Sequence, residues 1–148
     1  MTVINRESVR DALAGLLTTA LVGTAKPAQA VYGYQIGDFA GMTPVVTVSG
    51  EGIERRQNAV STREVVTIWL NVHVFVLYSD QGSWGEDDAE DRIDLIEQTI
   101  AETICNNRTG TYWANLQYAG RTQMGSLEIG GAEYRWEVIP VTATYFDN

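Results

Sequence analysis

The sequence predicts an α+β fold, a mostly antiparallel sheet with two main helices packed on it, in a single domain spanning residues 1–148. Three observations predict this class. Apolar residues alternate along one long run from Thr67 to Tyr78, apolar stripes recur at helical spacing in two other segments, and Gly130-Gly131 separates two strand-like runs. With 148 residues, of which 45% are hydrophobic, the chain is also long enough to bury one core.

The N-terminal segment predicts an amphipathic helix from Arg6 to Val22. Asn5 can accept a backbone hydrogen bond as its N-cap, and Gly23 can adopt the left-handed conformation that often follows a helix. Between them the apolar residues recur at helical spacing and form one stripe: Val9, Leu13, Leu16, Leu17 and Leu21. We expect this stripe to cover a sheet.

Two short strands are expected next, Val31 to Gln35 within an aromatic, glycine-containing loop, and Pro44 to Val48. The apolar pattern then lapses, because Glu51 to Arg63 contains few large apolar residues and shows no helical period. This composition predicts an exposed excursion that connects two strands.

The run from Thr67 to Tyr78 is the strongest strand signal. Its even-numbered positions are apolar throughout, and its odd-numbered positions are polar only at Asn71 and His73. The pattern predicts a central strand that is partly covered on its second face. Because it is longer than the usual ~5–6 residues, it should project beyond a compact core. On the second face, three side chains are expected to meet the second helix or a neighbouring subunit: Trp69, Phe75 and Leu77.

A second helix is expected after Ser83, because Ser83 and Glu86 have the spacing of a capping box. Several carboxylates follow, near the positive end of the helix dipole. The helical pattern ends at Asn106-Asn107, and its apolar stripe should be buried against the sheet: Ala89, Ile93, Ile96, Ile100 and Ile104.

The C-terminal third predicts three strands: Thr111 to Tyr118, Met124 to Ile129 and Ala132 to Phe146. A two-residue turn at Gly130-Gly131 sets Leu127 opposite Tyr134. Around Pro140 the apolar residues move from even to odd positions, which predicts a bulge or the passage of the strand into another environment.

Composition and motifs exclude several function classes. The formal net charge is −9 and Lys26 is the single lysine, which argues against a basic surface for nucleic-acid phosphates. His73 is the only histidine and lies in mid-strand, and Cys105 is the only cysteine. No run approaches the roughly 18–20 apolar residues that cross a bilayer. We therefore expect no catalytic residues, no cofactor, no metal and no membrane partner.

The order of elements resembles the tail-terminator proteins of long-tailed phages, relatives of the minor tail protein U of lambda-like phages. The likeness rests on Val65 to Tyr78, Asp88 to Ile104 and Glu133 to Tyr145. It implies a structural virion protein of the tail neck, assembled in the host cytoplasm. Its hexameric ring would cap the tail tube, stop tube growth and join the head connector, without catalysis. DNA would pass through the lumen without specific binding, since a negative wall repels phosphates.

The distribution of charge adds a hypothesis about how such a ring closes. From Asp80 to Glu97 eight carboxylates accompany one arginine, a balance of −7, whereas the excursion from Glu51 to Arg63 has a balance of +1. A ring uses a heterologous interface, in which one patch meets a different patch on the neighbour. We expect basic residues of one subunit to meet acidic residues of the next: Arg55, Arg56 and Arg63 against Asp87 and Asp88. Simple solvation of both segments is the alternative.

Two other function classes stay open. Head-completion, neck and tail-tube proteins of phages form similar assemblies and share the pattern. A small α+β ligand-binding protein or enzyme could instead use the aromatic loop Val31 to Phe39 with His73. That class requires a concave pocket with convergent polar groups and perturbed titrating residues.

Overall fold

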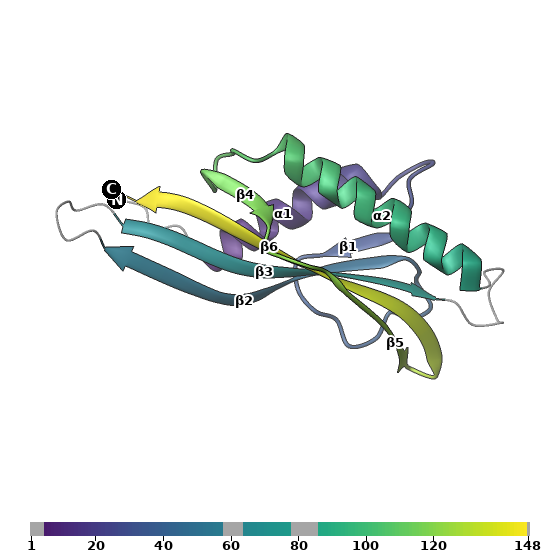
Figure 1. Cartoon of the computed structure of the whole chain (residues 1–148). Coiled ribbons are helices and arrows are strands. Elements are labelled where there is room, and N and C mark those ends of the chain that lie inside the picture. The colour runs from purple at the N-terminus through teal and green to yellow at the C-terminus, as the bar shows by residue number, and fades with distance from the viewer. Residues whose placement is uncertain (1–4, 58–63, 78–85, 148) are drawn as a thin grey trace.

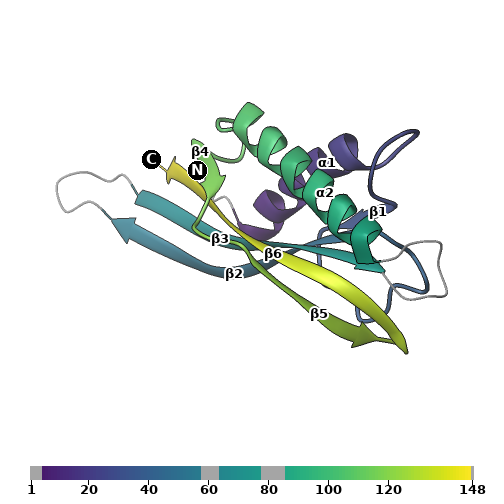
Figure 2. The ribbon, with the colours of Figure 1, turned by 45° about the vertical axis from the view of Figure 1, so that its right-hand side comes forward.

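Two helices lie on one face of a long, curled sheet (Figures 1 and 2). The computed structural model describes residues 5–57, 64–77 and 86–147. Its elements follow one another in this order: α1 (Arg6–Leu21), β1 (Ala30–Tyr32), β2 (Val45–Gln57), β3 (Glu64–Leu77), α2 (Glu86–Asn106), β4 (Asn115–Tyr118), β5 (Gln123–Ile129) and β6 (Ala132–Asp147).

Both helices form as predicted. The Asn5 side chain accepts a hydrogen bond from the Ser8 amide at 2.8 Å, and α1 ends one residue earlier than expected, at Leu21. In α2 all members of the predicted stripe from Ala89 to Ile104 are buried. The capping residue proposed for α2, Ser83, lies outside the described residues.

The sheet runs in the order β1-β2-β3-β6-β4, and β5 also pairs with β6. The α+β class with two helices is confirmed. The sheet was expected to be mostly antiparallel, but it is mixed, because β1 and β2 are parallel, and it is also curled. Parallel neighbours need a crossover connection. Here residues 33–44, which we call the strap, cross the side of the sheet opposite the helices and bring the chain back to start β2.

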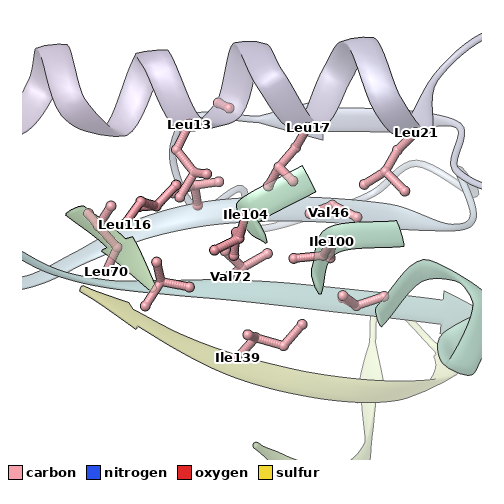
Figure 3. Close-up of a cluster of buried hydrophobic side chains, with 14 of the residues drawn as sticks. Leu13, Leu17, Leu21, Val46, Leu70, Val72, Ile100, Ile104, Leu116 and Ile139 are labelled. Atoms are coloured by element: carbon pink, nitrogen blue, oxygen red, sulfur yellow. The ribbon is translucent and has the colours of Figure 1, made fainter. Parts of the chain in front are cut away.

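Each face of the sheet has its own core. On the helix face, side chains of α1, α2 and the strands point toward one another, among them Leu17, Val72 and Ile100 (Figure 3). α1 lies over β1 and β2, and α2 lies over β3, β4 and β6. A smaller core lies on the opposite face, where Phe39 of the strap packs on Phe75 and Tyr134.

The predicted excursion after Ser49 is wrong for residues 51–57, which form the second half of β2. This half pairs with β3 from Trp69 to Glu64, after a bulge between Gly50 and Gly52. Its glycines and charges disfavour a strand, but a long neighbouring strand supplies the ladder and overrides propensity. Residues 58–63, including Arg63, lie outside the described residues.

Of the two alternatives expected near Pro140, the bulge is absent from the described ladder, and the strand instead passes from one core to the other. β6 pairs with β3 in an unbroken register from Tyr134 to Asp147. The apolar residues change parity because the two faces are covered at different places. The strap covers the even face near Tyr134 and Trp136, and the helices cover the odd face from Ile139 onward.

The C-terminal hairpin matches its prediction. Leu127 pairs with Tyr134, and the turn residues Gly130 and Gly131 have φ values of 59° and 82°. Both positive values fit the two-residue turn that matches strand twist. β4 and β5 lie one after the other along the same edge of β6. Pro140 faces the gap between them, where its missing N–H leaves no carbonyl of a neighbouring strand without a donor.

Candidate assembly surface

The ends of β2, β3 and β6 form an arm that extends past the helices (Figures 1 and 2). The arm comprises residues 53–57, 64–68 and 143–147, and its buried residues Val66, Ile68, Ala143 and Tyr145 continue the main core. In the β2–β3 ladder Arg55 lies opposite Val66, and Arg56 lies opposite Val65. Because successive side chains in a strand point to opposite faces, the two arginines extend from different sides of the arm.

Both arginines have partners on the arm itself. Arg55 Nη1 lies 3.8 Å from Glu64 Oε1, and Arg56 Nε donates to Glu54 Oε1 at 2.8 Å. The Arg56 side chain is 80% exposed. Exposed ion pairs contribute only about 0–1 kcal/mol, so these contacts can be exchanged for contacts to another molecule.

The acidic start of α2 lies at the other end of the sheet. Glu90 accepts a hydrogen bond from Arg135 Nε at 2.6 Å, and Arg135 pairs with Val76. Val76 and Val66 are ten positions apart along β3, roughly 33 Å at ~3.3 Å per residue. Asp88 is exposed, two residues before Glu90. The basic and acidic segments therefore cannot meet within one chain.

Asp87 also belongs to the first turn of α2. Its side chain lies outside the described residues, as does the whole of Arg63. Of the charged residues predicted for the ring contact, the structure thus places Arg55 and Arg56 on the arm and Asp88 at the opposite end.

The aromatic residues predicted for the interface have different surroundings. Trp69 is 37% exposed on the face opposite the helices. Phe75 is buried under Phe39, with ring centroids 4.8 Å apart. Its covering is neither the second helix nor a neighbouring subunit, but the strap of its own chain. Leu77 packs against the same small core.

The bare half of this face is uncharged on the β6 side of Trp69, and on the β2 side its nearest charged residues are Glu54, opposite Thr67, and Arg56. Alternation places Thr67, Thr142 and Thr144 beside it, and Phe146 further along β6 is 57% exposed. Exposed aromatic side chains surrounded by neutral residues are typical of the centre of a protein interface. We call these five residues the neutral patch; Thr67, Thr144 and Phe146 belong to the arm as well.

His73 has two polar neighbours on the same face. Its Nε2 lies 3.2 Å from Ser49 Oγ and 3.3 Å from Gln35 Nε2. Burial lowers the pKa of His73, and the nearby carboxylate of Glu51 opposes this shift. Both contacts are made to Nε2, whereas a serine–histidine–carboxylate relay needs its acid on the other ring nitrogen. Of the strap aromatics that could line a ligand pocket, Phe39 fills a core instead, whereas Tyr34 is exposed and lies edge-on to Tyr32.

A carboxyl cluster between α2 and β6 was missed by sequence reasoning. Glu137 is 5% exposed, and its pKa is raised by burial and by Glu97, Asp94 and Glu90, against a hydrogen bond with Thr122 that lowers it. The sequence pattern could have indicated that Glu137 is buried, because the odd-numbered residues of β6 that follow it are apolar, and they are buried in the structure.

Tyr118 completes this cluster. Its hydroxyl donates to Glu97 Oε1 at 3.0 Å, and burial followed by the Glu97 charge raises the tyrosine pKa. Within residues 5–57, 64–77 and 86–147, no group of histidine, cysteine and acidic residues has the arrangement of a metal site. The hydrogen bond between Tyr118 and Glu97 joins α2 to β4 of the sheet.

Comparison with known proteins identifies no family. No protein-family model and no curated protein sequence matches the chain. Neither helix of the described part combines the length and hydropathy needed to cross a bilayer.

Proposed function

We propose that the chain is a structural virion protein, a phage tail terminator. Its copies form a hexameric ring that caps the tail tube and joins it to the head connector. One observation carries the proposal: Arg55 and Arg56 extend from the arm, while the acidic start of α2 lies about 33 Å away along the same sheet. Patches of opposite charge at opposite ends favour head-to-tail contact, which closes into a ring when the rotation permits.

The charge arrangement also gives the contact its specificity. Each copy carries a net charge of −9, so two copies repel one another in most orientations. The arm is the approach that brings Arg55 and Arg56 against Asp87 and Asp88 of the next copy, and like charges disfavour other registers. Phe146 on the arm and Trp69 beside it can supply apolar area to the same contact.

The ring would lie between two other parts of the virion. The tail-tube protein lies on one side, the head connector lies on the other, and DNA passes through the lumen without specific binding. A wall of net negative charge lets the duplex slide because it does not retain phosphates.

Charge reversal on the arm tests the ring contact. In Arg55→Glu/Arg56→Glu the basic patch becomes acidic, so rings seen by light scattering and electron microscopy should dissociate. Asp87→Lys/Asp88→Lys should partly restore them. The matched control Arg6→Glu/Arg121→Glu changes the net charge equally at exposed sites away from the arm and should leave rings intact. An intact ring in the arm variant, or equal loss in the control, contradicts the proposal.

A tube-growth assay separates a terminator from a tube subunit. Purified rings added to polymerising tail-tube protein should stop elongation and sit at tube ends. Incorporation along the tube would instead indicate a tail-tube protein, and rings that leave tube growth unchanged would indicate a neck protein.

A further inference from the structure

The sheet ends in two edges of different character. Beyond its short pairing with β1, the outer edge of β2 carries a bulge between Gly50 and Gly52, followed by Glu54, Arg55 and Arg56. Bulges and charged side chains are the devices by which proteins protect a sheet edge from further pairing. The outer edge of β2 is therefore protected from pairing with a further strand.

The edge formed by β5 has no such protection. Its residues Gln123–Ile129 pair with β6 in an unbroken register, and in the described part of the chain with no other strand. The segment holds no proline and no basic residue, and Glu128 is its single charge. Met124 and Leu127 are 40% and 36% exposed. A regular, nearly uncharged edge with exposed apolar side chains is suited to pairing with another strand.

The turn geometry identifies which backbone groups this edge offers. In a two-residue turn the flanking residues, Ile129 and Ala132, form a hydrogen-bonded pair, and bonded pairs then alternate along the hairpin. Odd-numbered residues of β5 thus bond to β6. The same parity holds beyond the hairpin, because the carbonyls of Pro140 and Thr144 in β6 accept amides from the β4 side. Met124, Ser126 and Glu128 therefore direct their N–H and C=O groups outward.

We propose that β5 pairs antiparallel with β5 of a second copy, about a twofold axis at Ser126. In this register Met124 lies opposite Glu128 of the second copy, and Gln123 lies opposite its Ile129. The outward groups of one strand then meet those of the other, because Ser126 faces its own equivalent. No like charges stand opposite one another, so the edge is complementary to itself.

Side chains on the face opposite the helices support the same register. The Trp136 ring lies across Gly125, where an added Cβ would be 2.5 Å from Cζ2. Leu127 of the second copy stands opposite Gly125, which brings its exposed side chain against that ring. The twofold axis repeats this contact, so the exposed leucine of each copy is covered by a tryptophan of the other.

The contact goes beyond the proposed function and does not depend on it, since β5 and the arm lie at opposite ends of the sheet (Figure 1). Salt separates the two contacts. Screening weakens attraction between the arm and the acidic helix start, whereas a twofold contact at β5 draws two acidic helix starts closer and becomes stronger as salt rises.

The test removes one outward N–H. Ser126→Pro lacks the donor but keeps the β5–β6 ladder, and Gly125 before it adapts readily to a following proline. Both proteins carry Arg55→Glu/Arg56→Glu, so that the arm contact is absent. Sedimentation equilibrium should give a dimer for the parent, which has Ser126. The dissociation constant of the proline variant should be larger by about tenfold or more. Ser126→Thr, which keeps the N–H, should dimerise like the parent.

A second variant tests the same contact in case Ser126→Pro does not fold. Leu127→Glu changes an exposed side chain and removes its contact with Trp136 of the second copy. It should therefore also yield monomers, with unchanged far-ultraviolet circular dichroism. The proposal is overturned if the parent stays monomeric at millimolar concentration, or if folded Ser126→Pro or Leu127→Glu dimerises as tightly as the parent. Loss of the ring in Arg55→Glu/Arg56→Glu is measured separately, in a chain with unmodified β5. The two contacts are therefore tested independently.

Discussion

Substitution of Gly125 by alanine should destabilise the fold through a single contact. An alanine Cβ would lie 2.5 Å from Cζ2, 2.8 Å from Cε2 and 3.1 Å from Nε1 of Trp136. Carbon atoms in favourable contact are about 3.5–4.0 Å apart, so the ring must move by about 1 Å. Trp136 packs against the small core of Phe39, Phe75 and Tyr134, which limits that movement.

The expected loss follows from two opposing effects. Overpacking a well-filled site costs about 1–3 kcal/mol. Replacing a strand glycine by alanine recovers about 0.5–1 kcal/mol of backbone entropy. We expect Gly125→Ala to lower the free energy of unfolding by about 1–2 kcal/mol, with a changed tryptophan emission maximum in the folded state.

Urea unfolding followed by circular dichroism measures the change, with Gly50→Ala as the matched control. Gly50 also lies in a strand, but no atom lies within 4 Å of an added Cβ, so its substitution should leave stability the same or slightly higher. Gly125→Ala in a Trp136→Val background should lose most of its effect, because the ring is gone. Equal stability of Gly125→Ala and the unmodified chain would refute the placement of the ring.

Two further predictions concern titrating groups. Because the folded-state pKa of Glu137 is raised, its protonated form stabilises the fold at low pH, and this contribution is lost as pH rises through the folded pKa. Glu137→Gln should therefore raise the free energy of unfolding at pH 8 by about 1–2 kcal/mol and have less effect at pH 4. A variant that is less stable than the unmodified chain at pH 8 would contradict this. The imidazole resonance of His73, the single histidine, should titrate below 6.5, with stability lost as pH falls through that midpoint; a higher midpoint contradicts the burial argument.

Local signals predicted most of the elements. Asn5 marked the start of α1, helical spacing marked the buried side of α2, and Gly130-Gly131 set the hairpin register. Each of these depends on residues close together in the chain, so the pattern carries the information. β2 was predicted only to Val48, because its second half becomes a strand through pairing with β3 rather than through its own composition.

The candidate site was predictable in part. Charge counting identified Arg55, Arg56 and the acidic start of α2, but only the ladder shows that they lie at opposite ends of the sheet. Alternation in β3 placed Trp69 and Phe75 on one face. It could not separate the exposed residue from the buried one, since the covering side chain, Phe39, lies 36 positions from Phe75 in the chain.

By itself, the sequence determined the type of each main element and the side of β3 that meets the helices, because periodicity is a local property of the chain. The tertiary structure decided what the second face became. The strap crosses one half and seals it with Phe39, and the other half keeps Trp69 exposed beside the arm. That division follows from the crossover between β1 and β2 and from long-range pairing, which no local pattern contains.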